Sequence, residues 1–252
     1  MIESLALAAL GGVLIGLLLT LFGGGGSVLA TPWLLYVVGV SDTHAAIATS
    51  AAAVAVNAAT GLAAQARAGR VKWPCASLFA VAGLAGSVLG ARLAMQVDGD
   101  MLIRAFGGAM IAIALSMLVP RKSEGDPAVR LTAPMIWKLA PVGFVAGLAA
   151  GFFGIGGGFL IAPGLMAATG MTLANASASS LVSVALFGSA TSTTYALHGQ
   201  LLWPLFLALV AGGAVGTMLA MPILRRIERR VTWLRFGFAT LVIAVGAYIL
   251  LR

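Results

Sequence analysis

Two glycine clusters stand where apolar segments long enough to cross a membrane come to an end. The first lies in LFGGGGSVLATP at Leu21–Pro32, and the second lies in FFGIGGGFLIAP at Phe152–Pro163. Glycine weakens a helix and lets another molecule approach the main chain closely. A helix that starts after such a cluster presents free N–H groups and about half an elementary positive charge, which can bind an anion without a basic side chain. The pattern therefore predicts two anion-binding helix starts.

Small polar side chains in the segments after each cluster could donate hydrogen bonds to anion oxygens. With the glycines they form the predicted substrate site, whose residues are Gly24, Gly25, Gly26, Ser27, Thr49, Ser50, Asn57, Gly156, Gly157, Gly158, Ser179, Ser180 and Ser183. The second cluster has Ile155 and Gly158 where the first has Gly24 and Ser27, so a site lined by both is chemically asymmetric. A second interpretation stays open, in which the glycines only permit close packing and the hydroxyls only join neighbouring helices.

The composition is that of an integral membrane protein. Of the 252 residues, 61% are hydrophobic and 9% are charged, whereas a soluble domain carries about 25% charged residues. No Asp, Glu, Lys or Arg occurs between Leu139 and Leu224. The net charge of +8 comes from basic residues in short loops, which indicates membrane topology rather than a nucleic-acid partner. The single cysteine excludes an internal disulfide and a multi-cysteine metal site.

Hydropathy predicts an all-α fold with about eight long transmembrane helices and two short ones. The expected long segments are Ser4–Phe22, Ala45–Ala66, Pro74–Val97, Met101–Val119, Met135–Phe153, Leu173–Leu197, Leu201–Leu224 and Val231–Leu251. Two shorter apolar pieces, Ser27–Val40 and Gly158–Thr169, follow the glycine clusters. They cover only part of the hydrocarbon thickness, so we expect broken or re-entrant helices there.

The two halves of the chain are an internal duplication. Gly16–Pro32 aligns with Gly147–Pro163 at an offset of 131, and the motif GRVKWP at Gly69–Pro74 aligns with GQLLWP at Gly199–Pro204 at an offset of 130. Chance does not place so many glycines, prolines and tryptophans in one register. We therefore expect a first membrane repeat at residues 1–120, a cytoplasmic linker at 121–134 and a second membrane repeat at 135–252.

The basic loops predict that the two repeats are inverted. In the first repeat, Arg67, Arg70 and Lys72 follow the second long segment, whereas the equivalent loop of the second repeat has no Lys or Arg. The arginine cluster of the second repeat begins at Arg225, after the third long segment. Because cytoplasmic loops carry the excess of Lys and Arg, this shift by one span places the repeats in opposite orientations. A parallel duplication with a misleading charge pattern is the alternative.

These features resemble the TauE/SafE sulfite/sulfonate exporter family along the whole chain. The likeness rests on the glycine clusters followed by Pro32 and Pro163, on the small-residue stretches AAIATSAAAVAVNA and NASASSLVSVALFGS, and on the two Trp-Pro joins. The resemblance implies a multi-pass protein of the cytoplasmic membrane that moves small sulfur-containing anions. It favours the outward direction and leaves the substrate open, because the family is chemically broad.

We therefore expect a secondary transporter that exports sulfite or an organosulfonate, bound near the midplane where the repeats meet. No phosphate-binding P-loop occurs, so a gradient or the membrane potential would drive transport. The apolar part has no carboxylate pair, His cluster or Ser–His–Asp set, so we expect neither catalysis nor a cofactor nor a metal. An importer of a small organic acid and a passive anion channel are the alternatives. The expected partners are the anionic substrate and the lipid bilayer, and a homodimer is compatible with the sequence.

Overall fold

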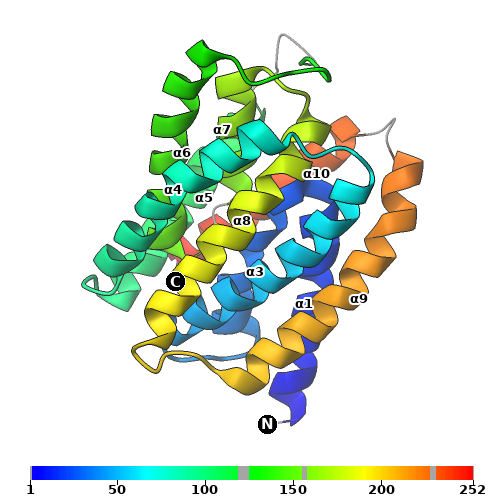
Figure 1. Ribbon diagram of the computed structural model, residues 1–252. Coiled ribbons are helices and arrows are strands. Elements are labelled where there is room, and N and C mark those ends of the chain that lie inside the picture. Colours follow the sequence, from blue (N-terminus) through cyan, green and yellow to red (C-terminus); the bar gives the residue numbers. More distant parts are fainter. Residues whose placement is uncertain (1, 119–124, 155–157, 228–230, 252) are drawn as a thin grey trace.

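The computed structural model folds the chain into helices joined by short loops (Figure 1). It describes residues 2–118, 125–154, 158–227 and 231–251. The long helices are α1 (Ile2–Phe22), α3 (Thr43–Arg67), α4 (Trp73–Ala94), α5 (Gly99–Leu118), α6 (Ala133–Phe153), α8 (Leu173–Ala196), α9 (Trp203–Ile227) and α10 (Val231–Leu251). The shorter elements are the 3₁₀ helix η1 (Gly23–Leu29), α2 (Ala30–Pro32), the π-helical turn η2 (Trp33–Val37) and α7 (Gly158–Thr169).

The all-α membrane fold predicted from hydropathy is confirmed. Six of the long helices, α1, α3, α4, α6, α8 and α9, are long and apolar enough over their described residues to cross a membrane. Each forms its main-chain hydrogen bonds internally, which is what a segment surrounded by lipid requires. Outside the helices, the described part of the chain has one isolated β-bridge, between Asp126 and Met171.

The duplication is visible in the turns that end equivalent helices. Gly39 and Gly170 have φ angles of 83° and 71° at an offset of 131, and Gly69 and Gly199 have φ angles of 69° and 73° at an offset of 130. Positive φ is a conformation that glycine adopts without steric cost. The two halves therefore share their turn geometry as well as their sequence pattern.

Glycines inside the long helices bring the two halves into close contact. Helix α4 packs along α6, and α1 packs along α9, so each half contributes a helix to the other. A methyl group added at Gly147 of α6 would collide with the main chain of Gly83 in α4. The same holds for Gly16 of α1 against Gly213 in α9, which is the equivalent contact in the other half. Small residues allow such close approach between membrane helices, where no hydrophobic effect drives association.

Helices α3 and α8 cross at the centre of the fold and run in opposite directions. Gly61, late in α3, faces Leu181 early in α8, whereas Gly188, late in α8, faces Ala51 early in α3. Figure 1 shows the α3–α4 loop in the upper half of the molecule and the α8–α9 loop at its lower edge. Opposite directions of equivalent helices are what an inverted duplication produces. The orientation of the repeats in a bilayer stays a prediction.

The two short segments differ from each other. Helix α7 has the bounds predicted for the second short helix, and it follows Gly154, which ends α6 in a left-handed conformation with φ 65°. The first segment was expected to begin as a helix at Ser27, but η1 already starts at Gly23 as 3₁₀ turns. The chain therefore has no clean break there. Pro32 lacks the N–H that a regular helix needs, and the π turn of η2 follows it directly.

Candidate anion-binding site

The two glycine clusters lie on segments that meet in the middle of the fold. The 3₁₀ helix η1 contacts α7, α1 and α8. Val28 and Leu29 of η1 belong to an apolar cluster against which Phe153, at the end of α6, and Leu160, near the start of α7, are packed. Helices α5 and α10 close the other side of this cluster through Phe106 and other apolar side chains. The fold thus brings together the two regions that the sequence marks as interrupted.

The glycines of the predicted site divide into three groups. Gly156 and Gly157 lie outside the described residues. For Gly24, Gly25 and Gly158 the structure gives the path of the main chain. Gly24 and Gly25 lie in η1, and Gly158 is the first residue of α7. Gly26 packs so closely on α1 that a methyl group there would collide with the main chain of Leu18 and Leu19. For Gly26, the contact given by the structure is therefore helix packing.

The hydroxyl groups of the predicted site are deeply buried. Ser27, Thr49, Ser179, Ser180 and Ser183 are 0% exposed, and the polar side chains of Ser50 and Asn57 are almost as inaccessible. These residues come from η1, α3 and α8. Because buried polar groups need partners, their hydrogen bonds indicate which of them are already committed within the protein.

Ser50 belongs to a short hydrogen-bonded chain that was not predicted from the sequence. Its Oγ lies 2.8 Å from Oγ1 of Thr31. It also donates to the carbonyl oxygen of Ile47 at 3.1 Å, so the Thr31 hydroxyl can act as the donor to Ser50. Thr31 stands just before Pro32, and its equivalent in the second half is Ala162. The threonine in LATP was the available signal, because a hydroxyl inside an apolar piece needs a partner.

Thr49 and Ser179 each accept a hydrogen bond from the main chain of the opposite half. The N–H of Leu202 donates to Oγ1 of Thr49 at 3.1 Å, and the N–H of Lys72 donates to Oγ of Ser179 at 2.9 Å. Thr49 and Ser179 are equivalent at the offset of 130, and so are Lys72 and Leu202. The two hydrogen bonds are therefore equivalent, and each joins a side chain of one half to the main chain of the other.

Asn57 and Ser183 retain hydrogen-bonding capacity. Nδ2 of Asn57 donates to the carbonyl oxygen of Leu209 at 3.4 Å, but its Oδ1 has no partner among the described residues. Oγ of Ser183 also has none there. Ser180 donates to the carbonyl oxygen of Ser177 at 2.8 Å. An unpartnered buried polar atom costs free energy. Among the predicted site residues, Ser183 is therefore a hydroxyl that is not committed to a partner within the described residues.

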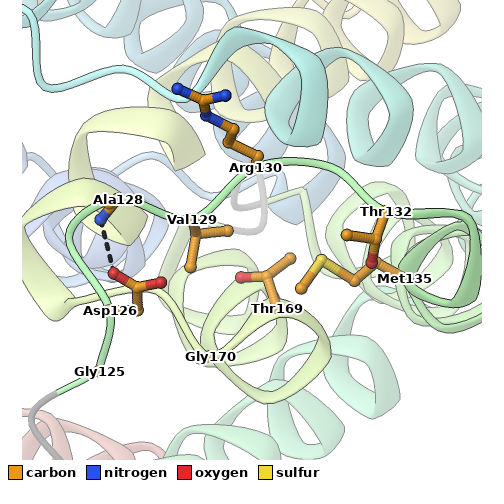
Figure 2. Close-up of a pocket in the computed structure, with 9 residues that line it drawn as sticks. All are labelled: Gly125, Asp126, Ala128, Val129, Arg130, Thr132, Met135, Thr169 and Gly170. Carbon is orange, nitrogen blue, oxygen red and sulfur yellow. Dashed lines mark hydrogen bonds between the residues drawn. The ribbon is translucent and has the colours of Figure 1, made fainter.

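Two cavities of the described structure have linings that do not include these residues. One, of about 680 Å³, is lined by residues of the 125–135 segment together with Thr169 and Gly170 (Figure 2). In Figure 2 the guanidinium of Arg130 is directed away from the other labelled side chains. The other cavity, of about 500 Å³, is lined by Gly39, Val40, Ser41, Asp42, Ala45, Gly199, Gln200 and Leu202. Neither of these two cavities therefore opens onto the described residues of the candidate site.

The described residues contain no group of three or more His, Cys, Asp and Glu side chains that could hold a metal ion. Asp42, which borders the smaller cavity, accepts a hydrogen bond from the main-chain N–H of His44 at 2.9 Å and so caps the start of α3. Main-chain dipoles, hydroxyls and amides are thus the groups that the centre of the described fold offers to a ligand.

Comparison with known proteins identifies the family to which this chain belongs. The model of the family described as "Sulfite exporter TauE/SafE" matches residues 8–249. A "Probable membrane transporter protein" of Xylella fastidiosa strain Temecula1 is 42% identical over 256 residues, which cover 100% of this chain and 97% of that protein. The "Probable membrane transporter protein YunE" of Bacillus subtilis is 24% identical and covers 87% of this chain and 88% of its own length. No solved structure was found to match. The chain therefore belongs to the TauE/SafE sulfite exporter family and is a multi-pass membrane transporter, not an enzyme.

Proposed function

We propose that this transporter exports a small sulfur-containing anion, sulfite or an organosulfonate, by secondary transport. The observation that carries the proposal is the meeting of η1 and α7 beside buried, uncharged donors at the centre of the fold. The family description supports sulfite as the first substrate to test. An importer of a small organic acid and a passive anion channel remain the competing functions.

The start of α7 supplies the positive electrostatic potential in this proposal. Gly156, Gly157 and Gly158 precede or open a helix of 12 residues, and the N-terminus of such a helix carries about half an elementary positive charge. No Lys or Arg occurs between Leu139 and Leu224. A bound anion would therefore be held by the main chain of the second repeat.

The first repeat and the centre of α8 supply the side-chain donors. Ser27 follows the first cluster, where the second repeat has a glycine. Asn57 and Ser183 are at most 1% exposed, which keeps water away and strengthens hydrogen bonds to a charged ligand. Ser50 is equally buried, but its hydroxyl would first have to release the carbonyl oxygen of Ile47. The resulting site recognises the oxygens of sulfite or sulfonate and is asymmetric because Ser27 has no equivalent.

The membrane potential can drive this export. A singly charged anion leaving a negative interior gains about 2.3 kcal/mol per 100 mV. The proposed orientation places the basic α3–α4 loop and the linker at residues 121–134 in the cytoplasm, between membrane repeats at residues 1–120 and 135–252. The anion would then bind near the midplane, where inverted repeats meet.

Counterflow in proteoliposomes tests the proposed function. Vesicles that hold purified protein and unlabelled sulfite should accumulate labelled sulfite against its gradient, with saturation at high concentration. Arms loaded with an organosulfonate and with a small carboxylate separate the substrate classes. Flux without saturation or counterflow would establish a channel, and counterflow by the carboxylate alone would establish an organic-acid carrier. Protein-free vesicles are the control.

A further inference from the structure

We infer that Thr49 and Ser179 are paired latches, each of which holds one end of the transport pathway closed. The inference deepens the transport function and does not depend on which anion is carried. The two hydrogen bonds, from Leu202 to Thr49 and from Lys72 to Ser179, are 3.1 Å and 2.9 Å long. Both hydroxyls are 0% exposed. Thr49 and Ser179 therefore act as positioning residues on the loops that they hold.

Each latch joins a long helix of one half to the start of a helix in the other half. Lys72 directly precedes Trp73 and Pro74 at the start of α4, and Leu202 directly precedes Trp203 and Pro204 at the start of α9. Lys72 occupies the N-cap position of α4, and its side chain makes no capping hydrogen bond. The hydroxyl of Ser179 thus fixes the entry of the chain into α4 from outside, and the hydroxyl of Thr49 does the same near the start of α9.

The two latches lie at opposite ends of the molecule. Thr49 and Ser179 are both the seventh residue of their helices, α3 and α8, and these helices run in opposite directions. In Figure 1 the α3–α4 loop, which precedes the Lys72 latch, lies in the upper half, and the α8–α9 loop lies at the lower edge. Leu202 and Ala45 also line the cavity of about 500 Å³ at that lower end. Opening one latch would let that cavity extend inward while the other end stays closed.

A carrier requires that its two ends open separately, and two equivalent bonds at opposite ends provide this. With both hydrogen bonds formed, the polar side chains predicted to bind the anion are buried, as observed. Breaking one bond exposes a hydroxyl and an N–H to water, which can replace the lost partner at small net cost. Loss of one hydroxyl should therefore raise the population that is open at its own end about two- to tenfold and leave the other end unchanged.

Cysteine reporters one turn deeper than each latch test the inference. Ala52 on α3 and Val182 on α8 are equivalent at the offset of 130 and are 9% and 8% exposed. Val182 packs in a cluster with Val71 and Ala76, which flank the segment held by the Ser179 latch. The full-length protein in membranes, with Cys75→Ala and one reporter, is treated with a membrane-impermeant thiol reagent from either side.

Thr49→Val should increase labelling of the Ala52→Cys reporter about two- to tenfold from one side only. Ser179→Ala should do the same for Val182→Cys from the opposite side. Thr49→Ser and Ser179→Thr retain the hydroxyl and should keep the parent rate, which separates a lost bond from misfolding. Thr60→Val and Ser192→Ala are the matched controls, because these hydroxyls bond within their own helices.

Labelling that rises at both reporters, or from the same side, would overturn the inference, and so would no rise in either variant. Because the reagent and the reporters need no substrate, a failure of sulfite transport leaves this result unchanged. Conversely, normal sulfite counterflow with unchanged labelling would reject the latches and keep the proposed function.

Discussion

Replacing Ser183 by alanine should stabilise the empty transporter and weaken its binding of the anion. Oγ of Ser183 is fully buried in α8 and has no partner among the described residues. Alanine removes this atom and leaves the helix otherwise intact, because alanine is the residue with the highest helix propensity. The stability of the empty protein and its affinity for the anion change in opposite directions, because the hydroxyl has no partner in the empty protein and would bond to the anion in the complex.

The size of both effects follows from the hydrogen bond. An unpaired buried polar group costs about 1–3 kcal/mol, and a hydrogen bond to a charged partner contributes about 1.5–3 kcal/mol. Since about 1.4 kcal/mol is a factor of ten, Ser183→Ala should raise the anion Kd roughly tenfold to a hundredfold. The unfolding temperature of the empty protein should rise by a few degrees, at about 2–4 °C per kcal/mol for a chain of this size.

Thermal unfolding in detergent and anion titration, performed on the same preparations, check both signs. Ser192→Ala is the control, because Ser192 is only partly buried on the same helix and donates to the carbonyl oxygen of Ser189 at 3.1 Å. It should change neither quantity appreciably. A lower unfolding temperature for Ser183→Ala would show that its hydroxyl has a partner in the protein. A higher unfolding temperature with unchanged affinity would show that the hydroxyl is not a ligand.

Three further predictions follow from the fold. On a cysteine-free background, Arg70→Cys and Gly199→Cys should be labelled from opposite sides of the membrane, and labelling from one side would reject inverted repeats. Gly147→Val should abolish folded protein, since the side chain would collide with the main chain of α4. The control Gly108→Val in α5 places its side chain in open space and should leave expression within twofold. Equal expression of the two variants would refute the packing argument. Ser27→Ala should weaken anion binding about tenfold in the same titration, and an unchanged Kd would exclude Ser27 from the site.

Hydropathy and local patterns were sufficient to predict the long helices and α7. The long segments required only runs of apolar residues, and the bounds of α7 followed from a glycine cluster and the Gly170 turn. The first short segment was predicted less well, because η1 continues helical turns through four glycines instead of breaking. Its conformation depends on packing against α1, where Gly26 has no room for a side chain.

The hydrogen-bond partners of the candidate site could not be predicted from local patterns. Ser50 and Thr31 are 19 residues apart, Thr49 and Leu202 are 153 apart, and Ser179 and Lys72 are 107 apart. The sequence identified the Ser and Thr side chains among them as polar groups that need hydrogen-bond partners. Which groups those partners are depends on how α3 and α8 cross and on where α4 and α9 begin.

The sequence alone determined that this chain is a duplicated helical membrane protein, because transfer of side chains into lipid and turn formation at glycine are local properties of the chain. It also determined that no Lys or Arg is available along residues 139–224. Only the tertiary structure decided that each half packs a helix against the other, that Thr49 and Ser179 bond to main chain, and that Ser183 does not bond within the described residues. Such pairings arise when distant segments close onto one another, and their geometry is set by helix packing rather than by residue type.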